Sequence, residues 1–171
     1  VGCVLSTGLD QQEALTLLLD IGTNGEMVLG NRDRMVSCST AAGPALEGAK
    51  ILCGMRGATG AIDHVWLEDG ALAYSVIGGG EPQGICGSGL LDAVAVLLET
   101  GVLTPDGRFQ DPEEVAHPAA AGRLGALDRQ KCFYFSGEGQ TQVFLCQKDI
   151  RELQLAKGAI AAGIGLMAAR L

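Results

Sequence analysis

The feature that most constrains the fold is the segment 17–31, LLLDIGTNGEMVLGN. Apolar runs flank a Gly-rich turn, so the pattern predicts strand, tight turn and strand. Asn24-Gly25 favours positive φ at both central positions of a hairpin turn, and Gly22 lets the backbone approach a ligand. Asp20 ends the first strand just before a hydroxyl and several backbone N–H groups. This arrangement indicates a site for Mg²⁺ and phosphate, although an ordinary hairpin with a solvated Asp has the same pattern.

Length and composition narrow the class of protein. The chain has 171 residues, of which 47% are hydrophobic, and this is enough for one domain with an apolar core. A net charge of −8 argues against a nucleic-acid backbone or an anionic membrane as partner. The longest apolar run, 159–169, is too short to span a bilayer. We therefore expect a soluble, cytoplasmic protein, and because the chain begins at Val1 we interpret it as a fragment.

The six cysteines form no C-x-x-C pair and do not cluster with either histidine. They lie within strand-like and helical runs, where a free cysteine behaves as a small buried hydrophobe. The spacing therefore predicts structural thiols in a reducing cytosol, without a zinc site or an iron–sulfur ligand set.

The segment 35–40 predicts a third strand, so that the chain begins with a mildly helical stretch, 1–14, and a three-stranded meander. Gly43-Pro44 is typical of a helix start, and the apolar spacing predicts a helix up to Cys53. Its N-terminal N–H groups would face an anion. Glu47 lies in the first turn, where it either complements the helix dipole or has a catalytic or ribose-binding role.

A second glycine-dense stretch follows a predicted hairpin, whose strands at 63–68 and 72–77 are joined by Asp69-Gly70. His64 is interpreted as a surface strand residue. The glycines of 84–89 precede an apolar helix that ends before Gly101; they are Gly84, Gly87 and Gly89. Ser88 lies at the start of this helix, where it either caps the helix or donates to a phosphate or ribose.

The segment 102–130 is polar and is expected to be an exposed connection carrying a short helical piece. Two strands follow, joined by Glu138-Gly139. The last helix shows a D-x-x-E capping pattern at Asp149 and a continuous apolar stripe to Met167. Its many small residues indicate close packing against another helix, and 150–170 is a candidate homodimer surface.

Several stretches in order resemble one known family: LLLDIGTNGEMVLGN, STAAGPALEGAKILCGMRGATGAI, YSVIGG, GICGSGLLDAVAVLLETGVL and KDIRELQLAKGAIAAG. They are similar to the C-terminal ATPase part of the reductive activators of corrinoid proteins, within the superfamily of actin, sugar kinases and chaperone ATPases. The resemblance implies an α/β fold, a ribonuclease-H-like half-domain with a mixed sheet flanked by helices. It further implies that ATP lies in a cleft between two such halves.

The same resemblance implies the roles of individual residues. Asp20 would hold Mg²⁺ through water or position the attacking water, and Glu26 is the second catalytic candidate. The residues that would line the β- and γ-phosphates are Gly22, Thr23, Asn24 and Gly25. Gly84, Gly87 and Ser88 would face the nucleotide, and Gln154 and Lys157 would approach the adenosine.

The family also has an N-terminal [2Fe–2S] ferredoxin domain, a linker, a first D-I-G-T-T phosphate loop and a late G-G-F-G adenosine loop. None of these motifs is present in residues 1–171. The chain is therefore expected to be one domain, the second half of an actin-like ATPase domain, whose partner is the other half of the same polypeptide. Alone, it should bind nucleotide weakly and hydrolyse almost none.

For the whole protein the resemblance implies ATP-dependent return of Co(II) corrinoid proteins to Co(I), a reaction of one-carbon metabolism in anaerobes. Two other interpretations remain. A small-molecule kinase on the same scaffold would need a carboxylate base, for which Glu26 and Glu47 are the candidates. A non-catalytic dimerisation or docking module would keep the fold without needing Asp20.

Overall fold

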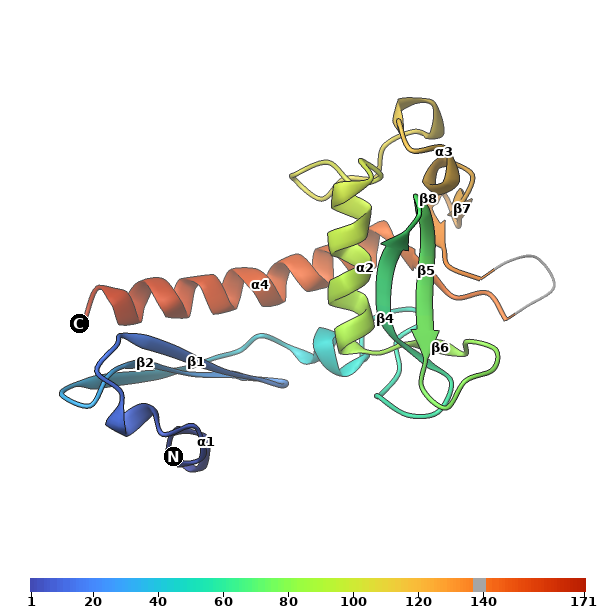
Figure 1. The fold of residues 1–171 in the computed structure, drawn as a ribbon. Coiled ribbons are helices and arrows are strands. Elements are labelled where there is room, and N and C mark those ends of the chain that lie inside the picture. Colours follow the sequence, from blue (N-terminus) through green and yellow to red (C-terminus); the bar gives the residue numbers. More distant parts are fainter. Residues whose placement is uncertain (137–140) are drawn as a thin grey trace. The chain divides into compact units, whose positions relative to one another are not determined.

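The computed structural model describes residues 1–136 and 141–171, and its architecture is mixed α/β, as predicted (Figure 1). The chain forms two compact units. Unit 1 consists of Val1–Pro44 and Leu155–Leu171, and unit 2 consists of Ala45–Gln154. Unit 2 is thus inserted into the chain of unit 1 between its third strand and its C-terminal helical segment, Leu155–Leu171. No helix among the described residues has the length and apolarity needed to cross a membrane.

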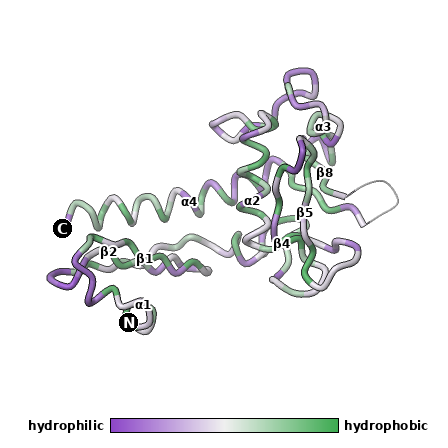
Figure 2. Tube along the Cα trace, in the orientation of Figure 1, coloured by the Kyte–Doolittle hydropathy of each residue, from purple (hydrophilic) through white to green (hydrophobic). Residues whose placement is uncertain are grey.

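Unit 1 is built on the predicted antiparallel meander. Its strands are β1 (Thr16–Ile21), β2 (Gly25–Gly30) and β3 (Met35–Thr40), in the order β1-β2-β3. They follow two short helical elements, α1 (Gly2–Thr7) and η1 (Leu9–Gln11). Figure 2 shows the apolar strands of the hairpin in green and the polar turn after β2 in purple. The meander forms because short turns separate strands with apolar runs, such as Met27, Val28 and Leu29 in β2.

The C-terminal part of α4 (Gln147–Ala168) covers one face of this sheet. Met27 and Leu29 on β2 are buried together with Met167, and the residues packed against them are Val36, Cys38, Ile160 and Ile164. The helix comes close to the sheet at Gly163, where an added Cβ would lie 2.2 Å from Met27 Cε. The predicted apolar stripe of the last helix is therefore confirmed in unit 1.

Unit 2 contains two small sheets. In the first, β5 (Ala71–Val76) pairs antiparallel with β4 (Ala61–Glu68), which pairs parallel with β6 (Gly84–Ile85). The β4–β5 turn is the predicted one, because Asp69 and Gly70 have φ of 49° and 76°. The second sheet has the order β7-β8-β9, formed by β7 (Leu124–Leu127), β8 (Gln130–Tyr134) and β9 (Phe144–Cys146).

Helix α2 (Gly87–Glu99) packs on β4 and supplies much of the core of unit 2. The core includes residues from 102–130, the segment that the sequence predicts to be exposed: Val102, Leu103, Phe109, Val115 and Ala120 are all buried. These few apolar side chains lie among many polar residues, so the overall composition of the segment does not indicate that they are buried. This segment also contains η3 (Pro112–Glu114) and α3 (Pro118–Ala121).

The helix predicted after Gly43-Pro44 is wrong in extent. Only a 3₁₀ turn, η2 (Pro44–Glu47), forms there. Positive φ angles at Gly48 (80°) and Lys50 (68°) end the helical path. An added Cβ at Gly48 would lie 2.5 Å from the backbone of Met55, so the loop folds back on itself instead of continuing as a helix.

Asp149 is the third residue of α4, and its hydrogen bonds differ from those of the predicted cap. It is fully buried in the first helical turn, where its carboxylate accepts hydrogen bonds from the N–H groups of Cys146 at 2.8 Å and Leu52 at 2.9 Å. A carboxylate at this position reaches back to the residue preceding the helix, as in the second half of a capping box. Burial raises the pKa of Asp149, against the opposing effect of the two hydrogen bonds.

The prediction that all six cysteines are free thiols is wrong for two of them. Cys132 and Cys146 are directly opposed in the β8–β9 ladder and form a disulfide. Cys3, Cys38, Cys53 and Cys86 are free. The sequence shows neither the register of β8 and β9 nor the pairing that follows from it. The turn predicted at Glu138-Gly139 lies outside the described residues.

Candidate functional site

The loop between β1 and β2 consists of Gly22, Thr23 and Asn24, because Ile21 and Gly25 are already paired in the ladder. Gly22 N–H donates to the carbonyl of Asn24 at 2.9 Å, which closes the loop. The expected turn centred on Asn24-Gly25 with positive φ is therefore wrong, since neither residue has a positive φ. The physical reason is register: Gly25 belongs to the strand, and the turn is one residue longer than the N-G signature predicts.

Gly25 packs closely against two side chains. It is buried, and an added Cβ would lie 3.0 Å from Thr40 Oγ1 and 3.4 Å from Ile160 Cγ1. The loop is held from a second side, because the Thr23 carbonyl accepts a hydrogen bond from Gly43 N–H at 2.8 Å. The loop therefore has a defined shape while Thr23 and Asn24 remain exposed.

Two carboxylates lie side by side at the loop end of the hairpin. Asp20 is directly opposite Glu26, and Glu26 is directly opposite Ser39 on β3, so the three residues form a row across one face of the sheet. Ser39 Oγ donates to Glu26 Oε1 at 3.2 Å, and Cys3 Sγ lies 3.5 Å from Asp20 Oδ2. Both carboxylates are exposed, so they remain accessible to a cation or water.

This row borders a concavity of about 390 Å³ on the face of the sheet opposite α4. Residues of α1 and all three strands line it, among them Cys3, Val4, Leu18, Asp20, Glu26, Val28, Ser37 and Ser39. The sequence reasoning missed Ser37 and Ser39. Their alternation along 35–40 was the available signal, since residues two apart on a strand share a face. The concavity places serine hydroxyls beside the predicted carboxylates.

Helix α2 begins where the second glycine-dense stretch predicts. Gly87 is its first residue, and an added Cβ there would lie 1.9 Å from the carbonyl oxygen of Leu46. This contact excludes every other residue at Gly87 without movement of the backbone. Gly84 is buried in β6, where an added Cβ would lie 2.7 Å from the Cys53 carbonyl oxygen. Both glycines thus allow segments of unit 2 to approach closely.

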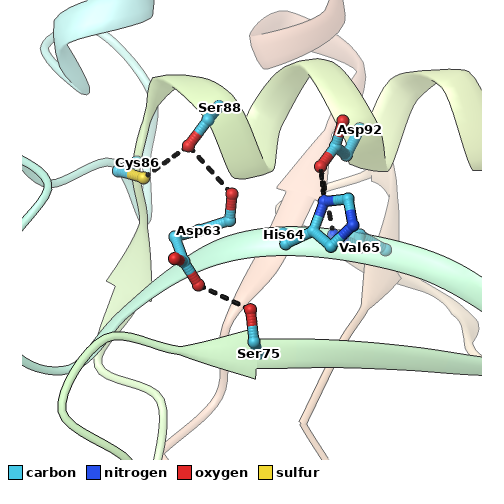
Figure 3. A network of polar contacts seen from close by, with 7 residues as sticks. All are labelled: Asp63, His64, Val65, Ser75, Cys86, Ser88 and Asp92. Carbon is cyan, nitrogen blue, oxygen red and sulfur yellow. Dashed lines mark hydrogen bonds and ion pairs between the residues drawn. The ribbon is translucent and has the colours of Figure 1, made fainter.

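Ser88 does not cap α2, so that interpretation is wrong. The residue before the helix is Cys86, and Ser88 is the second helical residue (Figure 3). Its Oγ donates to the Asp63 carbonyl at 2.8 Å and lies 3.3 Å from Cys86 Sγ. Ser88 lies inside the helix, two residues after the N-cap, and its hydroxyl links α2 to β4.

His64 and Asp92 form a second link between β4 and α2 (Figure 3). His64 Nδ1 contacts the Asp92 carboxylate, and its ring stacks on Trp66 with centroids 5.1 Å apart. The side chain of His64 is largely exposed, in agreement with its interpretation as a surface strand residue.

A second concavity, of about 350 Å³, lies beside the start of α2 in unit 2. Its lining combines a carboxylate, a guanidinium and the helix start: Leu46, Glu47, Met55, Arg56, Gly57 and Gly87. Glu47 and Gly87, which are distant in the sequence, are thus brought together. Arg56 was not singled out from the sequence, and its isolated position in a Gly-rich loop gave no specific signal.

Gln154 and Lys157 lie on α4. Gln154 Nε2 donates to the Asp106 carbonyl at 2.9 Å, and its Oε1 accepts from Arg151. The amide is therefore engaged with a loop of unit 2. Lys157 is exposed in unit 1. The residues predicted to contact nucleotide thus divide between the units: the hairpin loop and Lys157 belong to unit 1, and Gly84, Gly87, Ser88 and Gln154 belong to unit 2.

The two carboxylates have the donor chemistry that suits Mg²⁺. Within the part of the chain that the structure describes, no group of three or more His, Cys, Asp or Glu side chains could hold a metal. Mg²⁺ commonly keeps several waters and uses one or two carboxylates together with phosphate oxygens. Asp20 and Glu26 match that requirement.

Comparison with known proteins identifies relatives of this chain. A family model described as the C-terminal domain of RACo, the ASKHA domain, matches residues 14–171. The corrinoid activation enzyme RamQ of Eubacterium limosum is 44% identical over 94% of this chain and 28% of its own length. A [Co(II) methylated amine-specific corrinoid protein] reductase of Methanosarcina barkeri is 35% identical over 58% of this chain and 23% of its own length.

A solved structure gives the same assignment. The reductive activator for corrinoid, iron–sulfur protein aligns with a TM-score of 0.79 and 38% identity, over 98% of this chain and 27% of that one. The chain therefore spans about a quarter of the length of these relatives. The predicted fold class is confirmed by the family match and by this structure. The chain belongs to the family of C-terminal ASKHA domains of the reductive activators of corrinoid proteins.

Proposed function

We propose that this chain is the ATP- and Mg²⁺-binding half of an ATP-dependent activator that returns Co(II) corrinoid proteins to Co(I). The observation that carries the proposal is the row of Asp20, Glu26 and Ser39 at the end of a closed hairpin loop. The relatives named as corrinoid activators or reductases supply the class of reaction.

Asp20 is the proposed catalytic carboxylate. Its position beside the loop lets it hold water of the Mg²⁺ hydration shell or orient the water that attacks the γ-phosphate. Mg²⁺, when bound, would neutralise charge on the phosphate oxygens. Glu26 accepts a hydrogen bond from Ser39, which restricts its carboxylate to the same face of the sheet. We propose that Glu26 supports Asp20 by adding negative charge next to it and by accepting hydrogen bonds from water.

The loop would bind phosphate through Thr23, Asn24 and backbone N–H groups. Gly22 N–H is engaged with the Asn24 carbonyl, so Gly22 would shape the loop more than donate to phosphate. Gly25 would have the same indirect role, because it is buried against Thr40 and Ile160. In unit 2, Gly84 and Gly87 would likewise have an indirect role, by allowing backbone segments to approach closely. Ser88 already donates its hydroxyl hydrogen to the Asp63 carbonyl.

Residues 1–171 would supply one wall of the nucleotide site, and the rest of a longer polypeptide would supply the other. Gln154 and Lys157 are proposed for the adenosine side. The part of the chain that the structure describes holds no cysteine cluster suited to a [2Fe–2S] group. We propose that the electron donor binds elsewhere in the full-length protein, and the chain alone is expected to bind nucleotide weakly and to hydrolyse almost none.

The test uses a full-length, reduced protein that carries this domain, mixed with a candidate Co(II) corrinoid protein. The visible spectrum is recorded with and without ATP. We expect ATP-dependent appearance of Co(I), and a decrease of about 100-fold or more in its rate for Asp20→Ala. Asp33→Ala is the matched control, because Asp33 is an exposed aspartate in the turn at the other end of β2.

Each outcome separates the three functions considered. An unchanged rate for Asp20→Ala would favour a docking module. Absence of Co(I) with several corrinoid proteins, together with a phosphorylated small molecule, would favour a kinase. Equal losses for Asp20→Ala and Asp33→Ala would indicate a general effect on folding and would remove the support for a specific role.

A further inference from the structure

Two hydrogen bonds fix the backbone of the β1–β2 loop. The N–H of Gly22 donates to the Asn24 carbonyl at 2.9 Å, and the N–H of Gly43 donates to the Thr23 carbonyl at 2.8 Å. All four residues belong to unit 1. The first bond lies within the loop, whereas the second comes from the segment that follows β3. The direction of the Thr23 carbonyl is therefore set from outside the loop.

The bond from Gly43 also sets the direction of a donor. A peptide unit is planar and trans, so its C=O and N–H groups point in opposite directions. Since the Thr23 carbonyl points toward Gly43, the N–H of Asn24 points away from it. Asn24 is exposed, and within the described residues its N–H has no hydrogen-bond acceptor. The loop thus presents a backbone donor whose direction depends on Gly43.

The backbone conformation of Gly43 allows this bond. Its φ is 78°, in the left-handed region that residues with a side chain disfavour. The next residue is Pro44, and a residue before proline is normally extended. An added Cβ at Gly43 would meet no atom within 4 Å, so the constraint is conformational and not steric crowding. Alanine at this position would favour negative φ, which turns its N–H away from the Thr23 carbonyl.

We propose that Gly43 is a positioning residue for phosphate recognition and keeps the Asn24 N–H oriented for the β- and γ-phosphates of ATP. This rests on the proposed function, in which the loop binds these phosphates. Gly43 acts through the Thr23–Asn24 peptide and does not itself contact the nucleotide. A backbone N–H that is oriented in advance binds an anion without the cost of reorganisation. Gly43 thereby favours ATP over AMP, which lacks both of these phosphates.

A purely structural role for Gly43 predicts a different result. If Gly43 only stabilised unit 1, its replacement would weaken the binding of every nucleotide to the same extent. If Gly43 orients the phosphate donor, the loss is confined to nucleotides that carry β- and γ-phosphates. The comparison of ATP with AMP therefore distinguishes the two roles.

The test measures the Kd of Mg-ATP and of AMP for the full-length protein by isothermal titration calorimetry. Gly43→Ala should raise the Kd of ATP about tenfold or more and that of AMP less than about twofold, since one hydrogen bond to a charged group is lost. Gly70→Ala is the matched control. Gly70 has a φ of 76° and no atom within 4 Å of an added Cβ, but it lies in the β4–β5 turn of unit 2. Gly70→Ala should leave both Kd values unchanged.

A second substitution at the same position tests the conformational cause. Asparagine adopts the left-handed conformation more readily than alanine. Gly43→Asn should therefore retain more of the ATP affinity than Gly43→Ala. Equal losses for the two variants would contradict the dependence on positive φ.

Hydrogen–deuterium exchange gives a measurement without nucleotide. In the wild-type protein, we expect the bonded Gly43 amide to exchange at least about ten times more slowly than the exposed Asn24 amide. Addition of Mg-ATP should then slow the exchange of Asn24. Fast exchange of Gly43 would overturn the proposal whatever the protein binds.

The outcomes separate this proposal from the proposed function. An unchanged Kd of ATP in Gly43→Ala, or equal increases for ATP and AMP, would overturn the positioning role and leave ATP binding by the domain intact. Absence of ATP binding by the wild-type protein would overturn the proposed function together with this proposal.

Discussion

Unit 1 and unit 2 bury their apolar side chains to very different extents. Unit 2 has a continuous core that includes Phe109, Phe133 and Phe135, all at 1% exposure or less. The buried cluster of unit 1 consists of Met27, Leu29 and Met167. Since apolar burial is the main favourable term in folding, unit 2 should be the more stable of the two. The candidate carboxylates, Asp20 and Glu26, lie in unit 1, which has the smaller core.

The largest expected effect tests this difference in cores directly. Phe133→Ala removes a fully buried ring that packs edge to face on Phe135, and it should lower the free energy of unfolding by about 3–5 kcal/mol. Met27→Ala in unit 1 should lower it by about 2–3 kcal/mol. Urea unfolding followed by the single tryptophan, Trp66, reports unit 2, and circular dichroism reports both units. A larger loss for Met27→Ala would reverse the assignment of the stronger core.

Asp149→Ala should have the next largest effect. It leaves the buried N–H groups of Leu52 and Cys146 without their acceptor, and it should destabilise unit 2 by about 2–4 kcal/mol. The control is Glu152→Ala, which removes a neighbouring acid whose 3.7 Å ion pair with the exposed Lys50 should contribute little. Similar losses for the two variants in urea unfolding would show that the carboxylate of Asp149 does not hold the start of α4.

The pH dependence of stability also tests the burial of Asp149. Burial raises the pKa of Asp149 above its ordinary value of 3.8, so the folded state binds the proton more tightly than the unfolded state. The resulting stabilisation is complete below pH 3.8 and is lost as the pH rises through the folded pKa. Asp149→Asn removes this titration, so the stability of the wild type relative to the variant should decrease over that window. A relative stability that increases with pH would contradict the direction given.

The smallest expected effects on stability come from glycine substitutions in the β1–β2 and β4–β5 hairpins. Gly70→Ala should lower the free energy of unfolding by about 1–2 kcal/mol because alanine is strained at this positive φ. Crowding does not contribute, since an added Cβ would have no atom within 4 Å. Gly25→Ala should cost about 1–3 kcal/mol through crowding against Thr40. Thr40→Ala should therefore partly rescue Gly25→Ala in a double-mutant cycle measured by thermal unfolding. Additive losses would show that crowding at Thr40 is not the cause.

Elements with strong local patterns could be predicted from the sequence. The meander, the helix after Gly87 and the Asp69-Gly70 turn all depend on residues close in the chain, and the structure has them. The pairing of Asp20 with Glu26 was not among them, because it depends on the three-residue loop that the Asn24-Gly25 pattern does not predict. The resemblance to corrinoid activators named the family that the comparisons confirm.

What could not be predicted depends on contacts between distant residues. Asp149 is fully buried, and its carboxylate accepts a hydrogen bond from Leu52, which is far away in the sequence. Gly48 and Lys50 leave the helical path because the loop returns to Met55. Gly25 was interpreted as a turn residue, and its constraint comes from Thr40 and Ile160. In each case the local pattern was compatible with two structures and tertiary packing selected one.

The insertion of unit 2 has a consequence for the order of folding. Met27 and Met167 belong to one cluster, although the whole of Ala45–Gln154 separates their segments in the chain. Contacts across such a long interval form slowly, and a chain emerging from the ribosome presents β1, β2 and β3 long before α4 exists. We therefore expect unit 2 to fold first during synthesis. The strands that carry Asp20 and Glu26 would complete their packing only after α4 has been synthesised.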